Sequence, residues 1–236
     1  IQRNIMLCII MLLICNPFPI QSSNKKYYFR PLDITNGLSQ NTVYAILQDK
    51  YGFMWFGTQD GLNRYSGLSM QTFMKNDLSE NNTIAALHED KNGNIWIGSD
   101  AGIFTYNPDH EKISRFTLST EKGEMIQHRV TQIDSDDENI WFSVLEEGLY
   151  CYKPEQRALT LPFPRRNNRI PNDITQFLLN ESGTHWFALY ADNLYYTHNL
   201  TEPDSLKPFI SIDGRQLFKG DIINKMVKGK HNKLYI

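Results

Sequence analysis

Several features that would mark an enzyme or a nucleic-acid-binding protein are missing from this sequence of 236 residues. Its 3 cysteines include Cys8 and Cys15 in an apolar N-terminal stretch, which leaves Cys151 without a partner for a disulfide. The net charge is −2 and no basic cluster stands out, which disfavours nucleic acid as a partner. The 6 histidines lack zinc-ligand spacing. We therefore predict no cofactor and no metal.

Long apolar runs are also missing, with one exception near the start of the chain. Residues 5–15 are all apolar and follow Arg3, and Pro17 and Pro19 come soon after them. Eleven apolar residues are too few to span a bilayer but suit the core of a signal peptide. We predict a signal peptide at residues 1–22 and an exported protein, with an uncleaved signal anchor or a buried strand as the alternatives.

The strongest positive feature of the sequence is an internal repeat. The segment 49–65 recurs at 90–106, and less complete copies follow at 139–152 and 180–196. One tryptophan occupies the same place in each copy, so that Trp55, Trp96, Trp141 and Trp186 are 41, 45 and 45 residues apart. A degraded fifth copy has Tyr235 in the tryptophan position. A period of roughly 40–45 residues is typical of the blades of a β-propeller.

Each repeat contains four short apolar stretches bounded by Gly, Asp, Asn or Pro, which predicts four antiparallel strands. The fold class is therefore all-β, a β-propeller with four-stranded antiparallel blades, incomplete at about four blades and the start of a fifth. Residues 23–41 form an N-terminal segment in which Phe29 marks an outer strand that would close the ring in an intact protein. The predicted blades are 42–83, 84–129, 130–173 and 174–221, and a fifth begins at 222–236.

We expect the repeated residues to have structural roles. The tryptophans are expected to lie between neighbouring blades, where one ring fills much of the gap, and Gly52 and Gly93 fit turns that require a positive φ. The full set of structural repeat positions is Asp49, Gly52, Trp55, Gly57, Gly61, Tyr65, Asp90, Gly93, Trp96, Gly98, Gly102, Tyr106, Trp141, Gly148, Tyr152, Gly183, Trp186 and Tyr196.

The pattern Asp-x-x-Gly-x-x-Trp-x-Gly-Thr-x-x-Gly-Leu-x-x-Tyr, preceded by Gly-Leu-Ser-Gln-Asn-Thr-Val at 37–43, resembles the two-component regulator propeller repeat. The resemblance covers residues 27–236. The third copy departs from it by a turn one residue short and by Ser143 for Gly, and the fourth by Ala188 and Asn193 for Gly. The resemblance implies the N-terminal periplasmic sensor part of a Bacteroidetes-type hybrid two-component histidine kinase, a fragment whose membrane helix and kinase lie further downstream.

On this resemblance we expect the segment to detect an oligosaccharide and to control polysaccharide-utilisation genes, as a homodimer in the intact protein. Loops of a propeller vary freely on a rigid scaffold, so recognition is expected in loops. The candidate loops are 59–61, 121–129, 146–148 and 165–172. The alternative is a secreted or surface propeller that acts as a scaffold for protein–protein interaction without a kinase.

The sequence does not predict an enzymatic role for this segment. Asp-boxes of propeller glycosidases place Asp, Gly and Trp in a β-turn, but their spacing has one residue between Asp and Gly, whereas Asp49 and Gly52 are separated by two. No Gly-x-Ser-x-Gly motif and no phosphate loop occur. The acidic stretch 134–138 lacks the Gly and Glu of a calcium loop, so we interpret it as an acidic turn.

Overall fold

The structure, a computed structural model, describes residues 28–73, 83–117, 126–136, 138–164, 174–180, 183–200, 202, 205–229 and 233–236. The predicted signal peptide lies outside them. The chain divides into a first unit, 1–31, and a second, 32–236, which holds all the strands. None of the described helices has the length and apolar character needed to cross a membrane.

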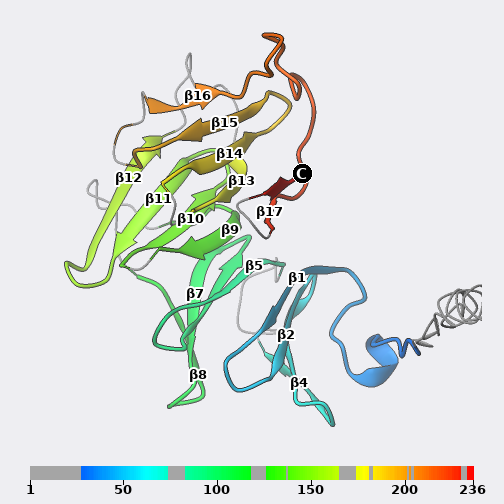
Figure 1. The fold of residues 1–236 in the computed structure, drawn as a ribbon. Coiled ribbons are helices and arrows are strands. Elements are labelled where there is room, and N and C mark those ends of the chain that lie inside the picture. Colours follow the sequence, from blue (N-terminus) through cyan, green and yellow to red (C-terminus); the bar gives the residue numbers. More distant parts are fainter. Residues whose placement is uncertain are drawn as a thin grey trace, which may run out of the picture. The chain divides into compact units, whose positions relative to one another are not determined.

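Four sheets of four antiparallel strands follow one another along the second unit (Figure 1). The first has β1 (Val43–Gln48), β2 (Met54–Thr58), β3 (Gly61–Tyr65) and β4 (Met70–Phe73). The second has β5 (Ile84–Glu89), β6 (Ile95–Ser99), β7 (Gly102–Asn107) and β8 (Lys112–Arg115). The third has β9 (Val130–Ser135), β10 (Ile140–Val144), β11 (Gly148–Lys153) and β12 (Ala158–Pro164). The fourth has β13 (Ile174–Leu178), β14 (His185–Leu189), β15 (Leu194–Thr197) and β16 (Lys207–Pro208).

These sheets confirm the predicted all-β propeller fold with four-stranded blades. Two differences concern the outer strands. The fourth strand of the last blade, β16, has only two residues and is shorter than β4, β8 and β12. Residues 28–33, around Phe29, form no strand, and Phe29 is 94% exposed because no sheet in the described chain pairs with it. After the fourth sheet comes a two-stranded sheet of β17 (Val227–Lys228) and β18 (Leu234–Tyr235).

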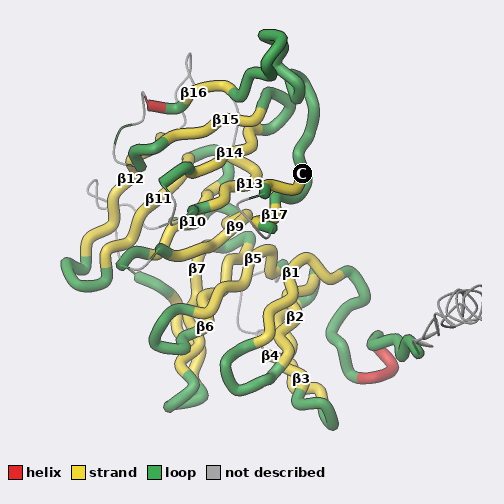
Figure 2. The backbone as a smooth tube through the Cα atoms, in the orientation of Figure 1, coloured by secondary structure: helices red, strands yellow, loops and turns green. Residues whose placement is uncertain are grey.

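The backbone tube shows the first strand of each sheet beside that of the next (Figure 2). The contacting pairs are β1 with β5, β5 with β9, and β9 with β13. A small residue on each second strand permits this approach. A Cβ on Gly57 would lie 2.8 Å from Ile84 Cγ2, and one on Gly98 would lie 2.8 Å from Val130 Cγ1. Ser143 and Ala188, the departures noted in the sequence, are still small, which explains why they are tolerated.

Each hydrophobic cluster joins two neighbouring blades, and each contains one of the repeated tryptophans. Trp55 packs with residues of the second blade such as Ile84 and Ile97, and Trp96 packs with Val130 and Phe142 of the third. Trp141 packs against the fourth blade. Trp186 packs against Ile223 and Met226, which precede β17. The tryptophans therefore lie between blades, where complete burial of a ring, as at Trp55, contributes about 3–5 kcal/mol by analogy with truncation of buried Trp.

A short N-terminal segment of the second unit lies along the first blade. The 3-10 helix η1 (Ile34–Asn36) is capped by Asp33 and ends at Gly37, whose φ is 95°. Leu38 is buried, and the backbone N–H of Ser39 donates to Asn63 Oδ1 at 3.0 Å. These contacts attach residues 33–39 to β3 rather than to a further sheet.

Candidate functional site

The turns between the first and second strands of the first three blades share one design, built on an aspartate. Asp49 Oδ1 accepts the backbone N–H groups of Tyr51 at 3.0 Å and Phe53 at 2.9 Å. Its Oδ2 accepts the indole N–H of Trp55 at 2.7 Å. Gly52, with φ of 88°, closes the turn. One carboxylate thus fixes both the turn and the tryptophan that fills the space between blades.

The second and third blades repeat this arrangement. Asp90 Oδ2 accepts from Trp96 Nε1 at 2.9 Å, and Asp136 Oδ2 accepts from Trp141 Nε1 at 2.7 Å. The third turn keeps the bond although it is one residue shorter. Burial acts to raise the pKa of Asp136, but hydrogen bonds from Trp141, Glu138 and Asn139 outweigh burial and hold that pKa below its usual value. The Asp136 carboxylate is therefore an anion held by the scaffold.

The fourth blade departs from this design at both ends of its turn. Asn180 occupies the aspartate position, and His185 occupies the position before tryptophan that is filled by Met54, Ile95 and Ile140 elsewhere. The backbone N–H of Asn180 donates to Nδ1 of His185 at 3.3 Å. In the other blades the corresponding N–H donates to a backbone carbonyl, as Asp49 does to Phe53 at 3.0 Å. A histidine ring has replaced a backbone acceptor.

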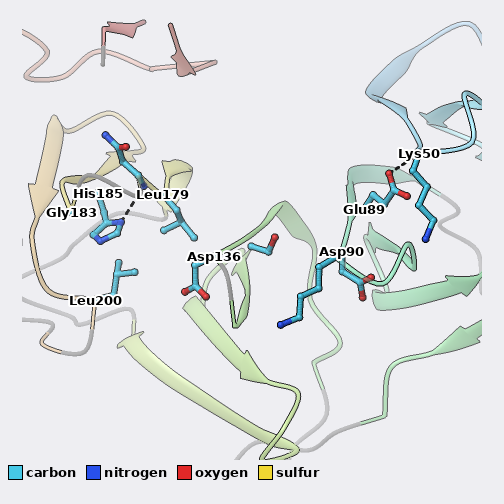
Figure 3. Close-up of a pocket in the computed structure, with 11 residues that line it drawn as sticks. Lys50, Glu89, Asp90, Asp136, Leu179, Gly183, His185 and Leu200 are labelled. Atoms are coloured by element: carbon cyan, nitrogen blue, oxygen red, sulfur yellow. Dashed lines mark hydrogen bonds between the residues drawn. The ribbon is translucent and has the colours of Figure 1, made fainter. Parts of the chain in front are cut away.

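These four turns border a cavity of about 700 Å³, a size in the range of small-molecule sites. Figure 3 shows His185, Leu179 and Leu200 on one side of it, Lys50 and Glu89 on the other, and Asp90 and Asp136 between. The remaining lining residues are Lys91, Ser135, Asn180 and Gly183. The cavity thus has one wall that combines apolar side chains with an imidazole, and one wall that carries charges of both signs.

The charged wall is held by contacts between the first two blades. Lys50 Nζ donates to the carbonyl of Asn92 at 3.0 Å, and the backbone N–H of Lys50 donates to Glu89 Oε2 at 2.9 Å. Glu89 Oε1 is buried without a hydrogen-bond partner in the described chain. Burial raises the pKa of Glu89, against the opposing effect of the hydrogen bond from Lys50.

A histidine also links the second and third blades beside the cavity. His88, at the end of β5, lies 2.8 Å from Ser135 Oγ through Nε2 and 3.9 Å from Asp134 Oδ1 through Nδ1. Burial lowers the pKa of His88, although Asp134 and Asp90 act to raise it. Burial raises the pKa of Asp134. The Ser135 hydrogen bond holds the ends of two adjacent inner strands together.

Comparison with known proteins assigns the repeat. The family model of the two component regulator propeller matches residues 37–60 and 77–101. The chain carries two-component regulator propeller repeats. This confirms the resemblance found in the sequence.

Relatives of these regulator propeller repeats are much longer than the chain. Histidine kinase P4 of Formosa agariphila is 33% identical over 75 residues, which are 32% of this chain and 6% of that protein. The extracellular domain of a candidate hybrid two component system from B. thetaiotaomicron has a TM-score of 0.71 at 23% identity, over 89% of this chain and 29% of that one. A second such domain, from a candidate one component system of B. thetaiotaomicron, has a TM-score of 0.65 at 21% identity, over 89% and 26%. The chain spans less than a third of each, and the two structures establish the fold.

Two of the loops singled out from the sequence, 59–61 and 146–148, lie at the other end of the strands. In an antiparallel sheet the first turn and the second turn are at opposite ends, so 59–61 and 146–148 are remote from the cavity. There, His128 Nδ1 lies 2.8 Å from Glu147 Oε1, and Arg129 pairs with Asp100 at 3.4 Å. Residues 121–125 and 165–172 of the other candidate loops lie outside the described chain.

Sequence reasoning identified Asp49, Asp90 and the tryptophans as repeat positions but missed the bond between them. The nearly constant spacing, six residues in two blades and five in the third, was the available signal. It also missed Leu179 and His185, which stand out only as departures from the repeat. Cys151 is buried, as expected for a small apolar residue, and burial raises the pKa of its thiol to about 11. Within the described residues no group of three or more His, Cys, Asp or Glu could hold a metal ion.

Proposed function

We propose that this chain is the ligand-sensing propeller of a two-component regulator, located outside the cytoplasm, and that it detects oligosaccharides to control polysaccharide-utilisation genes. The observation that carries the proposal is the match of two consecutive blades to the two component regulator propeller, a repeat named for signalling proteins. Similarity to extracellular domains of candidate two component systems and to a histidine kinase supports the same assignment.

The physical properties of the chain suit such a sensor. The inner strands of adjacent blades contact each other, and side-chain bonds such as Lys50 to Asn92 and His88 to Ser135 connect them. Blades joined in this way respond to a ligand together rather than one at a time. A sensor needs a ligand that binds two arrangements of the protein with different affinity, a coupling of typically 1–3 kcal/mol. The homodimer and the kinase that would read such a difference are part of the proposal.

The proposal is tested in the organism that carries the gene. The gene is deleted, and transcripts are compared after exposure to a panel of plant and animal oligosaccharides. We expect the deletion strain to lose its transcriptional response to one class of oligosaccharide. The response should return when the complete gene is returned. Unchanged responses to every oligosaccharide in the panel would contradict the sensor function. A kinase core encoded further along the coding DNA would support the sensor function. Absence of a kinase core from the complete gene would favour the scaffold alternative.

A further inference from the structure

The histidine at the start of β14 is in a fixed chemical state that can be derived from its hydrogen bond. Nδ1 of His185 accepts the backbone N–H of Asn180, so Nδ1 carries no proton. Burial lowers the pKa of His185, which outweighs the opposing effect of Asp136, and the ring is therefore neutral near pH 7. A neutral ring with a bare Nδ1 has its proton on Nε2. His185 thus has one N–H donor at Nε2, and that atom has no hydrogen-bond partner among the described residues.

This donor lies at the edge of the hydrophobic cluster around Trp141, because Leu179 and Leu200 are partly buried against that cluster and also line the cavity. His185 lines the cavity between Leu179 and Leu200, and the three lie together in Figure 3. None of the three follows the repeat: Gln48, Glu89 and Ser135 occupy the position of Leu179 in the other blades. Departures from a repeat that gather in one place are expected at functional sites.

Charge on the opposite wall limits what the cavity can accept. Lys50 and Glu89 lie on that wall, and the lining also includes the positive side chain of Lys91 and the negative side chains of Asp90 and Asp136, which lie between the two walls. The oxygens of Asp90 and Asp136 are already occupied by backbone N–H groups and by Trp96 and Trp141. An acidic ligand would therefore meet an excess of fixed negative charge, whereas a neutral ligand would not.

Resting on the sensor function proposed above, we propose that the cavity binds a neutral oligosaccharide, and that His185 donates through Nε2 to a hydroxyl oxygen of one sugar ring. The apolar C–H face of that ring packs on Leu179 and Leu200. A hydroxyl group offers the acceptor that the imidazole lacks, and the combination of an apolar wall with a few placed polar groups is typical of small-molecule sites. His185 is therefore a specificity-determining residue of the site.

Two substitutions separate the roles of the two ring nitrogens. In His185→Asn the side-chain oxygen can replace Nδ1 as acceptor for Asn180, but nothing replaces Nε2. In His185→Gln the amide N–H₂ reaches the position of Nε2 and keeps a donor in the cavity. We expect the Asn variant to bind about 5- to 10-fold more weakly, the value of one hydrogen bond, and the Gln variant to bind within about threefold of the wild type.

Binding is measured by calorimetry on the protein made from its complete gene. The probes are xylotetraose, mannotetraose and cellotetraose as neutral sugars and tetragalacturonic acid as an acidic one. In parallel, ¹⁵N-labelled histidine reports the His185 tautomer and its response to each sugar. Binding of a neutral sugar with a shift at His185 Nε2, weakened in the Asn variant alone, supports the proposal. Preference for the acidic sugar, equal losses in both variants, or no response of His185 to any probe overturns it.

The transcriptional test keeps this proposal distinct from the sensor function. If the His185→Asn strain responds to the inducing oligosaccharide as the wild type does, the binding site lies elsewhere although the protein is a sensor. If the deletion strain shows no defect, the sensor function itself fails.

Discussion

The turns of the first three blades and the turn of the fourth use the same position of the fold in different ways. In the first three, an aspartate accepts two backbone N–H groups and one indole N–H, as Asp49 does with Trp55. In the fourth, Asn180 and His185 replace this unit, and Trp186 is only half-buried. The aspartate turns hold the scaffold together through these bonds, whereas the fourth turn places the His185 ring on the lining of the cavity. Binding and stability are thus divided among blades of one repeat.

Among tests of this comparison, we expect the largest change in stability from the loss of a tryptophan. Trp55→Ala should lower the free energy of unfolding by about 3–5 kcal/mol, because the ring is fully buried between two blades. Trp186→Ala should cost about 1–2 kcal/mol, because its ring is half-buried. Urea unfolding of the protein from its complete gene, followed by circular dichroism, measures both. Equal losses would show that the fourth blade is as tightly built as the first.

The aspartate itself gives the next largest effect. Asp90→Ala should cost about 2–3 kcal/mol, because the indole N–H of Trp96 and the backbone N–H groups of Asn92 and Asn94 lose their acceptor. Asn180→Ala is the matched control in the fourth blade and should cost about 1 kcal/mol or less. The same unfolding assay applies, with Trp96 fluorescence as a local signal. A larger loss for Asn180→Ala would reverse the comparison.

The close approach of blades can be tested at the small residue of the second strand. Gly98→Ala should cost about 1–2 kcal/mol, because the new Cβ would lie 2.8 Å from Val130 and 3.0 Å from Ala86. The reverse change in the fourth blade, Ala188→Gly, should cost about 1–2 kcal/mol, because it adds backbone entropy to the unfolded chain and removes a buried methyl group. Melting temperatures of the two variants measure both losses. If Gly98→Ala left the melting temperature unchanged, the second and third blades could move apart without a loss of stability.

The sequence predicted the blades because the features that build them repeat. Trp55 and Trp96 have the same neighbours in each copy, and a period in the forties leaves few folds to consider. It did not predict the cavity, because Leu179, His185 and Leu200 belong to no shared pattern and come together only through the packing of the fourth blade. The candidate loops were predicted because the loops of a propeller vary freely. That criterion does not indicate at which end of the sheets a cavity lies.

The smallest expected effect is a dependence of stability on pH that both histidines produce. Burial lowers the pKa of His88 and of His185 below 6.5, so each is neutral in the folded protein at a pH where the unfolded chain binds a proton. The unfolded state therefore gains protons first as the pH falls from 7 through 6.5, and stability decreases, by at most about 1.4 kcal/mol per pH unit for each histidine. The groups that act on the pKa of His88 through their charge are Asp134 and Asp90, and those that act on the pKa of His185 are Asp136 and His198. Because burial lowers the pKa of both rings, His88→Gln and His185→Gln should each flatten the slope between pH 6.5 and 5.5. Urea midpoints across this range measure the slope of stability against pH.

A slope unaffected by either change would mean that both rings titrate alike in the folded and unfolded chain. The neutral His185, on which donation through Nε2 depends, would then lose its support.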